Sequence, residues 1–335
     1  MIEFDMVNVK NLCLVALAAT AIGSCRTDKT GADTGEEIFF ADPTIFVENG
    51  KYYLTGTRGA GAIGFQLLES DDLTTWTMSH ADTARFMLKQ GEQTFGDWGF
   101  WAPQIYKEEG SPYCLFYTAN EQVVVAKSDS LTGKFTQKEL RPIDGSEKNI
   151  DPFLFKDDDG KYYLYHVRFD NGNYLWSAEY DMENDSIDKS TLVRCFGLTD
   201  AWEKTDDNKW SPVMEGPTVF KKDGVYYMFY SANHFLNQDY AVGYATAPAP
   251  QGPWTKYAGN PIIHKSIVGE PGSGHGDMFK GLDDKLYYVY HVHNCDSVVT
   301  PRRTRIVPLI FQRNDSTGVY TISADSANII IPRIK

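Results

Sequence analysis

One motif recurs five times along this chain, and it constrains the fold more than any other feature. Each copy opens with a short segment, proline-containing in four of the five, and passes through a turn into a run rich in paired tyrosines. The copies begin at Phe40, Trp101, Asp151, Glu215 and Gly276. They lie roughly 50 to 65 residues apart, a length that a four-stranded propeller blade with its loops can occupy. Five such units predict a five-bladed β-propeller.

Each copy also has the pattern of a β-hairpin. The turns Asn49-Gly50, Asp159-Gly160 and Asp223-Gly224 are strong two-residue hairpin signals. Tyr52-Tyr53 follows the first of them, and aromatic runs of this kind favour strands. The chain is therefore predicted to be all-β, with residues 38–335 forming one five-bladed propeller domain whose funnel lies on the central axis.

The composition excludes some classes of partner. With 335 residues, of which 42% are hydrophobic, the chain is long enough to bury a large core. Its formal net charge is −13 and its pI about 5.0. An acidic balance argues against nucleic acid and anionic membrane surfaces as partners. The aromatic share of 14% suits both packing between blades and the binding of sugars.

The first residues look like a targeting segment rather than part of the fold. An apolar run, Leu12–Ile22, is too short to span a bilayer as a stable helix. It ends in Ile22-Gly23-Ser24-Cys25, which resembles a bacterial lipoprotein signal. We therefore predict a signal peptide over residues 1–24, a lipid anchor on Cys25 and a flexible tether over residues 25–37. The protein would be an exported lipoprotein, periplasmic or anchored to the outer membrane; an uncleaved anchor or a chance apolar run is the alternative.

Three carboxylic side chains stand at the openings of the first, third and fourth copies: Asp42, Asp151 and Glu215. The first strand of a propeller blade lines the central axis, so equivalent positions at these openings meet at one mouth. Like charges at close range raise one another's pKa. Acid–base chemistry uses this, because it needs one ionised carboxylate and one protonated carboxyl near neutral pH. The alternative is that Asp42 and Asp151 only cap turns ahead of their prolines.

Five short segments stand at the openings in a fixed order. They are Ala41-Asp42-Pro43, Trp101-Ala102-Pro103, Ile150-Asp151-Pro152, Met214-Glu215-Gly216-Pro217-Thr218 and Gly274-His275-Gly276. Together they resemble the signature of glycoside hydrolase family 43, and the likeness covers residues 38–311. Each segment alone is a weak signal, because Asp-Pro dipeptides are common in turns. Their order at blade spacing makes the resemblance specific.

The resemblance implies a role for each acid. Asp42 would be the general base that activates water, and Glu215 the general acid that protonates the leaving oxygen. Asp151 would raise the pKa of Glu215 and hold it in position. The family inverts at the anomeric carbon, so a water must fit between base and sugar. The carboxyls of Asp42 and Glu215 should then stand roughly 6.5–9.5 Å apart.

The resemblance also suggests residues that bind the sugar. Trp101 resembles the family's stacking residue, and the nearby Trp98 would add to an apolar wall, with a core position as its alternative. Arg302 falls where family members carry an arginine that reaches the sugar or the central aspartate. Arg303 and Arg305 are so close in the sequence that either could occupy this position instead of Arg302.

His275 resembles a histidine that in many members lies on the axis beneath the acids. There it holds calcium or another cation, often through water, and Asp277 is placed to assist. The alternative is a hydrogen-bonded core histidine, which is the commoner state of a single His. The chemistry itself needs no cofactor, so such a cation would be structural.

The expected function is that of an exo-acting, inverting glycoside hydrolase acting on polysaccharide or oligosaccharide. The expected substrate is an α-L-arabinofuranosyl linkage; a β-D-xylosyl linkage ranks second, and a galactosyl or galactofuranosyl linkage third. The enzyme is expected to be a monomer. One alternative is a retaining fructan hydrolase, a group with an Asn-Asp-Pro opening and a Glu-Cys pair. This chain has Ala41-Asp42-Pro43 and Glu215-Gly216 instead. Another is a non-catalytic sugar-binding propeller lipoprotein, which would tolerate loss of Asp42 or Glu215.

Overall fold

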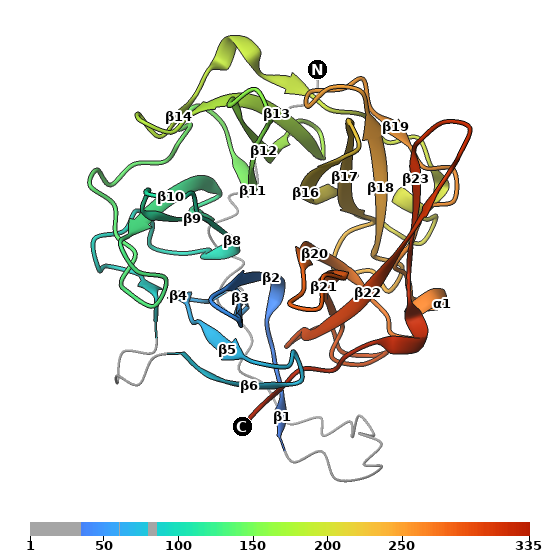
Figure 1. Ribbon diagram of the computed structural model, residues 1–335, viewed down its shortest axis with the longest axis horizontal. Coiled ribbons are helices and arrows are strands. Elements are labelled where there is room, and N and C mark those ends of the chain that lie inside the picture. Colours follow the sequence, from blue (N-terminus) through green and yellow to red (C-terminus); the bar gives the residue numbers. More distant parts are fainter. Residues whose placement is uncertain (1–34, 60, 80–85) are drawn as a thin grey trace, which may run out of the picture. The chain divides into compact units, whose positions relative to one another are not determined.

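The computed structural model describes residues 35–59, 61–79 and 86–335. The predicted signal peptide and Cys25 lie outside these ranges, as does most of the predicted tether. Within them, five sheets stand as blades around a common axis, so the predicted all-β five-bladed propeller is confirmed (Figure 1). No helix in the described ranges is long and apolar enough to cross a bilayer.

The strands of each blade follow one another outward from the axis. The innermost strands are β2 (Ala41–Glu48), β8 (Trp101–Tyr106), β11 (Asn149–Lys156), β16 (Met214–Lys222) and β20 (Gly274–Lys280). Each pairs antiparallel with a second strand: β3 (Lys51–Thr57), β9 (Tyr113–Ala119), β12 (Tyr162–Phe169), β17 (Val225–Ala232) or β21 (Leu286–Val292). The third strands are β5 (Leu68–Ser70), β10 (Gln122–Ser128), β13 (Asn173–Asp181), β18 (Ala241–Ala247) and β22 (Arg303–Arg313).

The outer elements are short. The outer strands are β6 (Thr75–Met78), β14 (Ser186–Ile187), β15 (Val193–Arg194), β19 (Thr255–Lys256) and β23 (Tyr320–Ala324). A separate ribbon pairs β4 (Gly64–Phe65) with β7 (Leu88–Lys89). The helical turns are η2 (Lys189–Thr191), η3 (Ala201–Glu203), α1 (Lys265–Val268) and η4 (Ser326–Asn328).

The paired tyrosines explain how the blades hold together. Tyr52 packs into the core between the fifth and first blades, whereas Tyr53 packs into the core between the first and second. Tyr287 and Tyr288 divide in the same way between the two cores that flank the fifth blade. Successive side chains of a strand point to opposite faces of the sheet. A tyrosine pair therefore gives one ring to each of the two neighbouring cores.

The two ends of the propeller meet at the outer edge of the first blade (Figure 1). β24 (Arg333–Ile334) runs parallel to β6, and β1 (Glu36–Glu37) pairs antiparallel with β24. From the sequence, the apolar residues 38–40 would be the natural strand partner of the apolar chain end, but this prediction is wrong. Ile38 and Phe40 are buried between the fifth and first blades instead, where apolar side chains gain more than on an outer edge. Residues 36–37, predicted as tether, pair within the propeller.

Candidate active site

Each innermost strand opens with a β-bulge, and the bulges build the mouth of the funnel. Pairing with the second strand shifts there, and the residue in the bulge has a positive φ. The bulge residues are Asp42, Ala102, Asp151, Gly216 and His275, with φ of 48°, 46°, 55°, 60° and 36°. Proline follows four of them, which fits because proline has no N–H to give to an interrupted ladder. These residues and the two that follow each line one narrow cavity on the axis.

Glu215 lies one residue ahead of the bulge in its blade. The sequence suggested that Glu215 and the two aspartates hold equivalent positions, but Gly216 occupies the bulge. A Cβ on Gly216 would lie 2.6 Å from His275 Cδ2, because the imidazole of the next blade packs directly on this backbone. The structure nevertheless brings Asp42, Asp151 and Glu215 together as buried side chains that influence one another's pKa.

In four blades, a side chain of the preceding blade accepts the N–H of the bulge residue. The pairs are Ala102 N–H to Thr57 Oγ1 (2.9 Å), Asp151 N–H to Thr118 Oγ1 (3.0 Å), His275 N–H to Ser231 Oγ (2.8 Å) and Asp42 N–H to His291 Nδ1 (3.1 Å). All four acceptors stand at the same register position, opposite the first residue before their own blade's bulge. These bonds hold the bulges in place because a buried N–H without a partner is costly.

The bulge of the fourth blade has a different partner. Gly216 N–H donates to Asp151 Oδ2 at 3.2 Å. The residue at the acceptor's register position is Val167, which pairs with Ile150 and carries no polar side-chain atom. The N–H is therefore left for the carboxylate. This bond ties Asp151 to the peptide unit that directly follows Glu215.

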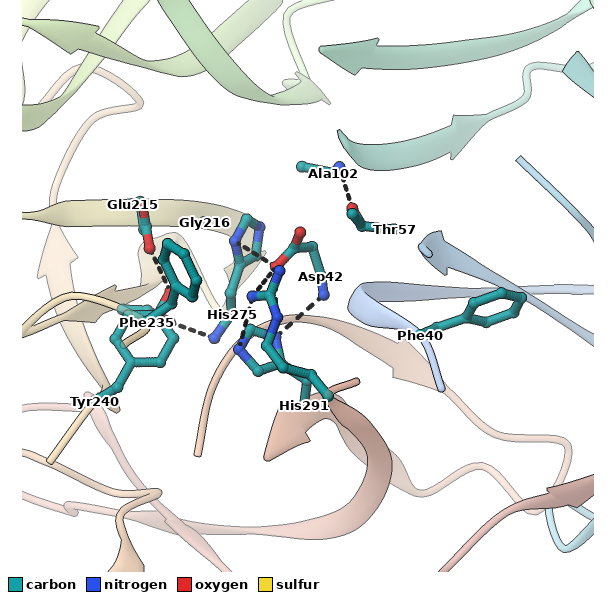
Figure 2. Close-up of polar contacts among 12 residues, drawn as sticks. Phe40, Asp42, Thr57, Ala102, Glu215, Gly216, Phe235, Tyr240, His275 and His291 are labelled. Atoms are coloured by element: carbon teal, nitrogen blue, oxygen red, sulfur yellow. Dashed lines mark hydrogen bonds and ion pairs between the residues drawn. The ribbon is translucent and has the colours of Figure 1, made fainter. Parts of the chain in front are cut away.

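Asp42 is held in its ionised form. Arg302 Nη1 donates to Asp42 Oδ1 at 3.1 Å, and Figure 2 shows Asp42 beside His275 and His291. Burial alone would raise the pKa of Asp42, but the Arg302 guanidinium and the Thr57 hydroxyl lower it below its ordinary value. Burial lowers the pKa of both histidines, so they stay neutral and Arg302 supplies the positive charge.

Glu215 has the opposite electrostatics. Burial and the nearby charge of Asp42 raise the pKa of Glu215 to about 7. The hydroxyl of Tyr240 donates to Glu215 Oε1 at 2.7 Å and moderates this rise (Figure 2). The Tyr240 ring stacks on His291 with 5.7 Å between centroids, so its position is set by the next blade. Glu215 is thus a carboxyl that retains a proton close to neutral pH.

Asp151 joins the two sides of the group. Burial, followed by repulsion from Glu215 and Asp42, raises the pKa of Asp151 well above its ordinary value. The Gly216 N–H and the Arg302 guanidinium act in the other direction. Because two close carboxylates cannot readily both ionise, Asp151 and Glu215 together keep a proton through neutral pH.

His275 lies close to two of the acids. Its Nδ1 is 3.4 Å from Asp42 Oδ1 and 3.7 Å from Asp151 Oδ2. Asp277 lies further along the axis, where it accepts from the Thr44 hydroxyl at 2.6 Å and the Thr218 hydroxyl at 3.2 Å. Burial raises the pKa of Asp277 to about 6.

These axial residues do not by themselves form a cation-binding shell. Across the described ranges, no group of three or more His, Cys, Asp or Glu side chains is placed to hold a metal ion. His275 would offer one nitrogen, and the carboxylate of Asp277 is already occupied by two hydroxyls. A hard cation such as calcium takes six to eight oxygen ligands.

The predicted sugar-binding residues lie on two sides of the mouth. Trp98 and Trp101 contact each other edge to face, with centroids 5.6 Å apart, and 45% of Trp98 is exposed, so it is not a core residue. Arg302 is the arginine that reaches Asp42, which resolves the register. Arg303 and Arg305 instead bind Glu270 and Glu37.

Two residues that contact the acids or Arg302 were not predicted from the sequence. Tyr240 contacts Glu215, and the ring of Phe235 lies 4.8 Å from the Arg302 guanidinium. Both belong to the connection between β17 and β18, which the topology carries back to the mouth. A signal was present, since this connection is longer than those of the second and third blades. The tyrosine-rich composition concealed it.

The family described as "Glycosyl hydrolases family 43" matches residues 37–316. The chain belongs to glycoside hydrolase family 43. It is therefore a glycosidase, an enzyme that hydrolyses O-glycosyl bonds.

Several known proteins resemble this chain. It is 40% identical to an endo-1,4-β-xylanase of Bacteroides thetaiotaomicron, with a TM-score of 0.80 over 90% of this chain and 99% of that one. It is 28% identical to a thermostable family-43 glycoside hydrolase, with a TM-score of 0.75 over 88% and 96% of the two chains. A β-D-galactofuranosidase of Aspergillus niger is 25% identical over 79% of this chain and 78% of its own length. The chain spans about half of other relatives, such as 48% of a Bacillus subtilis β-xylosidase.

Proposed function

We propose that this glycosidase inverts the anomeric carbon and releases terminal α-L-arabinofuranosyl residues, with β-D-xylosyl and galactofuranosyl residues as further substrates. One observation carries the mechanism: the pKa of Asp42 is lowered while that of Glu215 is raised to about 7, in one buried group at one mouth. An ionised base and a protonated acid are what hydrolysis of a glycosidic bond requires.

In the proposed reaction, Asp42 accepts a proton from a water molecule as that water attacks the anomeric carbon. Glu215 gives its proton to the glycosidic oxygen as the bond to the leaving group breaks. The sugar leaves with inverted configuration, and both carboxyls exchange their protons with solvent afterwards. We expect their carboxyls to stand roughly 6.5–9.5 Å apart, since the water must fit between base and sugar.

The surrounding residues serve these two roles. Arg302 keeps Asp42 ionised, and Tyr240 orients Glu215 through its Oε1, which leaves the second oxygen to carry the proton. Asp151 shares a proton with Glu215, and the Gly216 N–H, which favours the ionised form of Asp151, favours the state in which Glu215 holds that proton. Trp101 and Trp98 would provide the apolar wall for the sugar ring.

The sugar specificity is supported by the names of relatives that resemble the chain. They include enzymes described as a β-D-galactofuranosidase, a xylosidase/arabinosidase and an endo-α-(1→5)-L-arabinanase. A second candidate is an endo-acting xylanase, because the structure that is 40% identical carries the name endo-1,4-β-xylanase.

Release of sugar from three aryl glycosides tests the proposal: α-L-arabinofuranoside, β-D-xyloside and β-D-galactofuranoside. Release fastest from the arabinofuranoside, with the inverted anomer in the first NMR spectra, is the expected result. The retained anomer would contradict inversion. Xylan cut to oligosaccharides with no aryl hydrolysis would favour the second candidate, and no release from any substrate would favour a sugar-binding propeller.

We also propose that the protein is a monomeric lipoprotein anchored through Cys25, on the strength of the signal-like segment before it. Cys25→Ala should move the protein from the membrane fraction to the soluble fraction. The proposed axial cation near His275 remains a separate expectation, and a metal analysis of the purified protein would test it.

A further inference from the structure

We propose that Trp210 and His234 form a second carbohydrate-binding platform at the mouth, on the leaving-group side of the cleaved bond. This inference rests on the proposed function and adds a subsite to it. The topology places both residues at the mouth. β16 begins there with Met214 and Glu215, and β17 returns there at Ala232. Trp210 lies four residues before the start of β16, and His234 lies two residues after the end of β17.

A row of stacked rings leads from the reacting group to solvent. The Trp210 and His234 rings are parallel, with 4.9 Å between centroids and 11° between planes. The His234 and Phe235 rings lie 5.0 Å apart at 18°. Phe235 in turn covers the guanidinium of Arg302, which binds Asp42. The platform is thus joined to Asp42 through two ring stacks, one cation–π contact and one ion pair.

Buried amides hold the platform rigid. Asn208 Oδ1 accepts from Trp210 N–H at 2.9 Å, and Asn208 Nδ2 donates to Asn233 Oδ1 at 2.8 Å. Asn233 is fully buried. Asn233 and His234 have φ of 84° and 69°, two consecutive left-handed residues that are not glycine. Backbone strain of this kind gathers at ligand sites, where the surroundings impose it.

The exposed face of Trp210 has no packing role that would explain it. Among the described tryptophans, only Trp98 and Trp210 are exposed, by 45% and 53%. Both stand just before an innermost strand, β8 or β16, so both lie at the mouth. Trp98 is held by the same device, since its N–H donates to Asn120 Oδ1 and Asn120 has a φ of 54°. Two blades on different sides of the funnel thus each present one tryptophan.

The chemistry of the platform fits a pyranose ring. A flat, rigid aromatic face takes the C–H face of a sugar at little entropic cost. His234 stays neutral, because burial lowers its pKa to about 4, so the stack carries no charge at neutral pH. Trp210 lies in the segment that leads into β16, the strand that carries Glu215, and Glu215 protonates the leaving oxygen in the proposed reaction. The platform should therefore bind a backbone unit of the leaving group, such as a β-linked xylosyl residue.

The experiment compares Trp210→Ala with Trp210→Phe on two kinds of substrate. For Trp210→Ala, kcat/KM on xylo-oligosaccharides and arabinoxylan oligosaccharides should fall by about tenfold, the size of one lost stacking contact. On the aryl glycoside, which does not reach the platform, the change should stay within about twofold. Trp210→Phe should recover most of the loss. Leu282→Ala, an exposed residue in the turn at the other end of β20, is the control and should change neither value.

Unchanged kcat/KM on the oligosaccharides would overturn the platform. Equal losses on both substrates would also overturn it, because they would mean that Trp210 only supports the fold. Titration of xylohexaose against Glu215→Ala, with and without Trp210→Ala, separates the two proposals. Weaker binding without Trp210 supports the platform even if the wild type cleaves nothing. If the wild type cleaves the substrate but Trp210→Ala leaves binding unchanged, the proposed function stands and the platform is wrong.

Discussion

The opening of the fourth blade differs from those of the other four. Elsewhere, a hydroxyl or imidazole of the preceding blade accepts the N–H of the bulge residue. In the fourth blade that acceptor is replaced by Val167, and the N–H of Gly216 goes to the carboxylate of Asp151. The fourth blade is also the one whose acid precedes the bulge. The departure from the repeat therefore stands where two acids must be coupled.

The comparison shows how a repeat is adapted to chemistry. In the four regular openings, the bulge N–H donates to the neighbouring blade and so helps to hold the scaffold together, because buried N–H groups need an acceptor. In the fourth opening, the bulge N–H donates to Asp151 and orients it beside Glu215. Because Gly216 has no Cβ, the His275 ring can lie directly against the backbone of this bulge. The second blade has Ala102 at the equivalent position, so a Cβ is tolerated there. Each of these differences can be removed singly.

The largest expected effect comes from Asp42→Ala. The first blade opens regularly, and the Asp42 N–H still has His291 as its acceptor, so the fold should survive. Without its general base the enzyme should lose about 10²- to 10⁴-fold in kcat on natural and aryl glycosides alike. Steady-state kinetics on both substrates, with a thermal melt as the control, measure this. Retained aryl hydrolysis would contradict the base assignment.

Glu215→Ala should distinguish the irregular blade from the regular one. A natural leaving group needs protonation, so its kcat should fall by about 10²- to 10⁴-fold. An aryl leaving group needs little protonation, and its loss should be at least about tenfold smaller. Parallel kinetics on a nitrophenyl glycoside and an oligosaccharide give the two ratios. Equal ratios would argue against Glu215 as the acid.

Gly216→Ala should destabilise the protein where the equivalent alanine of the second blade does not. The added Cβ would meet the His275 ring at 2.6 Å, and a forced contact of this kind costs about 1–3 kcal/mol. The free energy of unfolding should fall by that amount, and kcat should fall with it as His275 is displaced. Denaturant melts measure the stability, with Ala102→Gly as the matched control, which should change little. An unaltered melt for Gly216→Ala would show that the ring moves freely.

The features that repeat in every blade could be predicted from the sequence. Turn dipeptides and tyrosine pairs recur because every blade needs the same hairpin and the same two cores, so the five blades were predictable. Asp42 and Asp151 could be assigned to the openings of their blades because an Asp-Pro pair recurs at the start of the repeat. The one-residue offset of Glu215 was not predictable, since it depends on pairing between β16 and β17. Tyr240 was missed for a related reason, because only the folded loop brings it to Glu215.

Tyr240→Phe should change the pH profile rather than abolish activity. Glu215 must be protonated to act, so activity is present below its pKa of about 7 and is lost as the pH rises through it. The Tyr240 hydroxyl lowers that pKa by donating to Oε1. Its removal should raise the pKa and move the descending limb of kcat against pH upward by roughly half to one unit, the size of one hydrogen bond. A limb that stays in place or moves downward would contradict this account.

The smallest effect tests the comparison itself. Val167→Thr would give the fourth blade the hydroxyl that Thr57 and Thr118 supply elsewhere, and this hydroxyl would compete with Asp151 for the Gly216 N–H. Asp151 would then lose a donor that favours its ionised form, and its pKa would rise. With less negative charge beside it, Glu215 would give up its proton more readily. The descending limb should therefore move downward by about a few tenths of a pH unit.

Val167→Ala is the matched variant, because it alters the side chain without offering an acceptor. Its descending limb should stay with the wild type, although its melt should show the loss of two methyl groups. Opposite shifts for Val167→Thr and Tyr240→Phe, with none for Val167→Ala, would trace the pKa of Glu215 to the two hydrogen bonds seen at the irregular opening. A shift shared by both Val167 variants would instead assign the effect to packing around residue 167, and not to the hydrogen bond between Gly216 and Asp151.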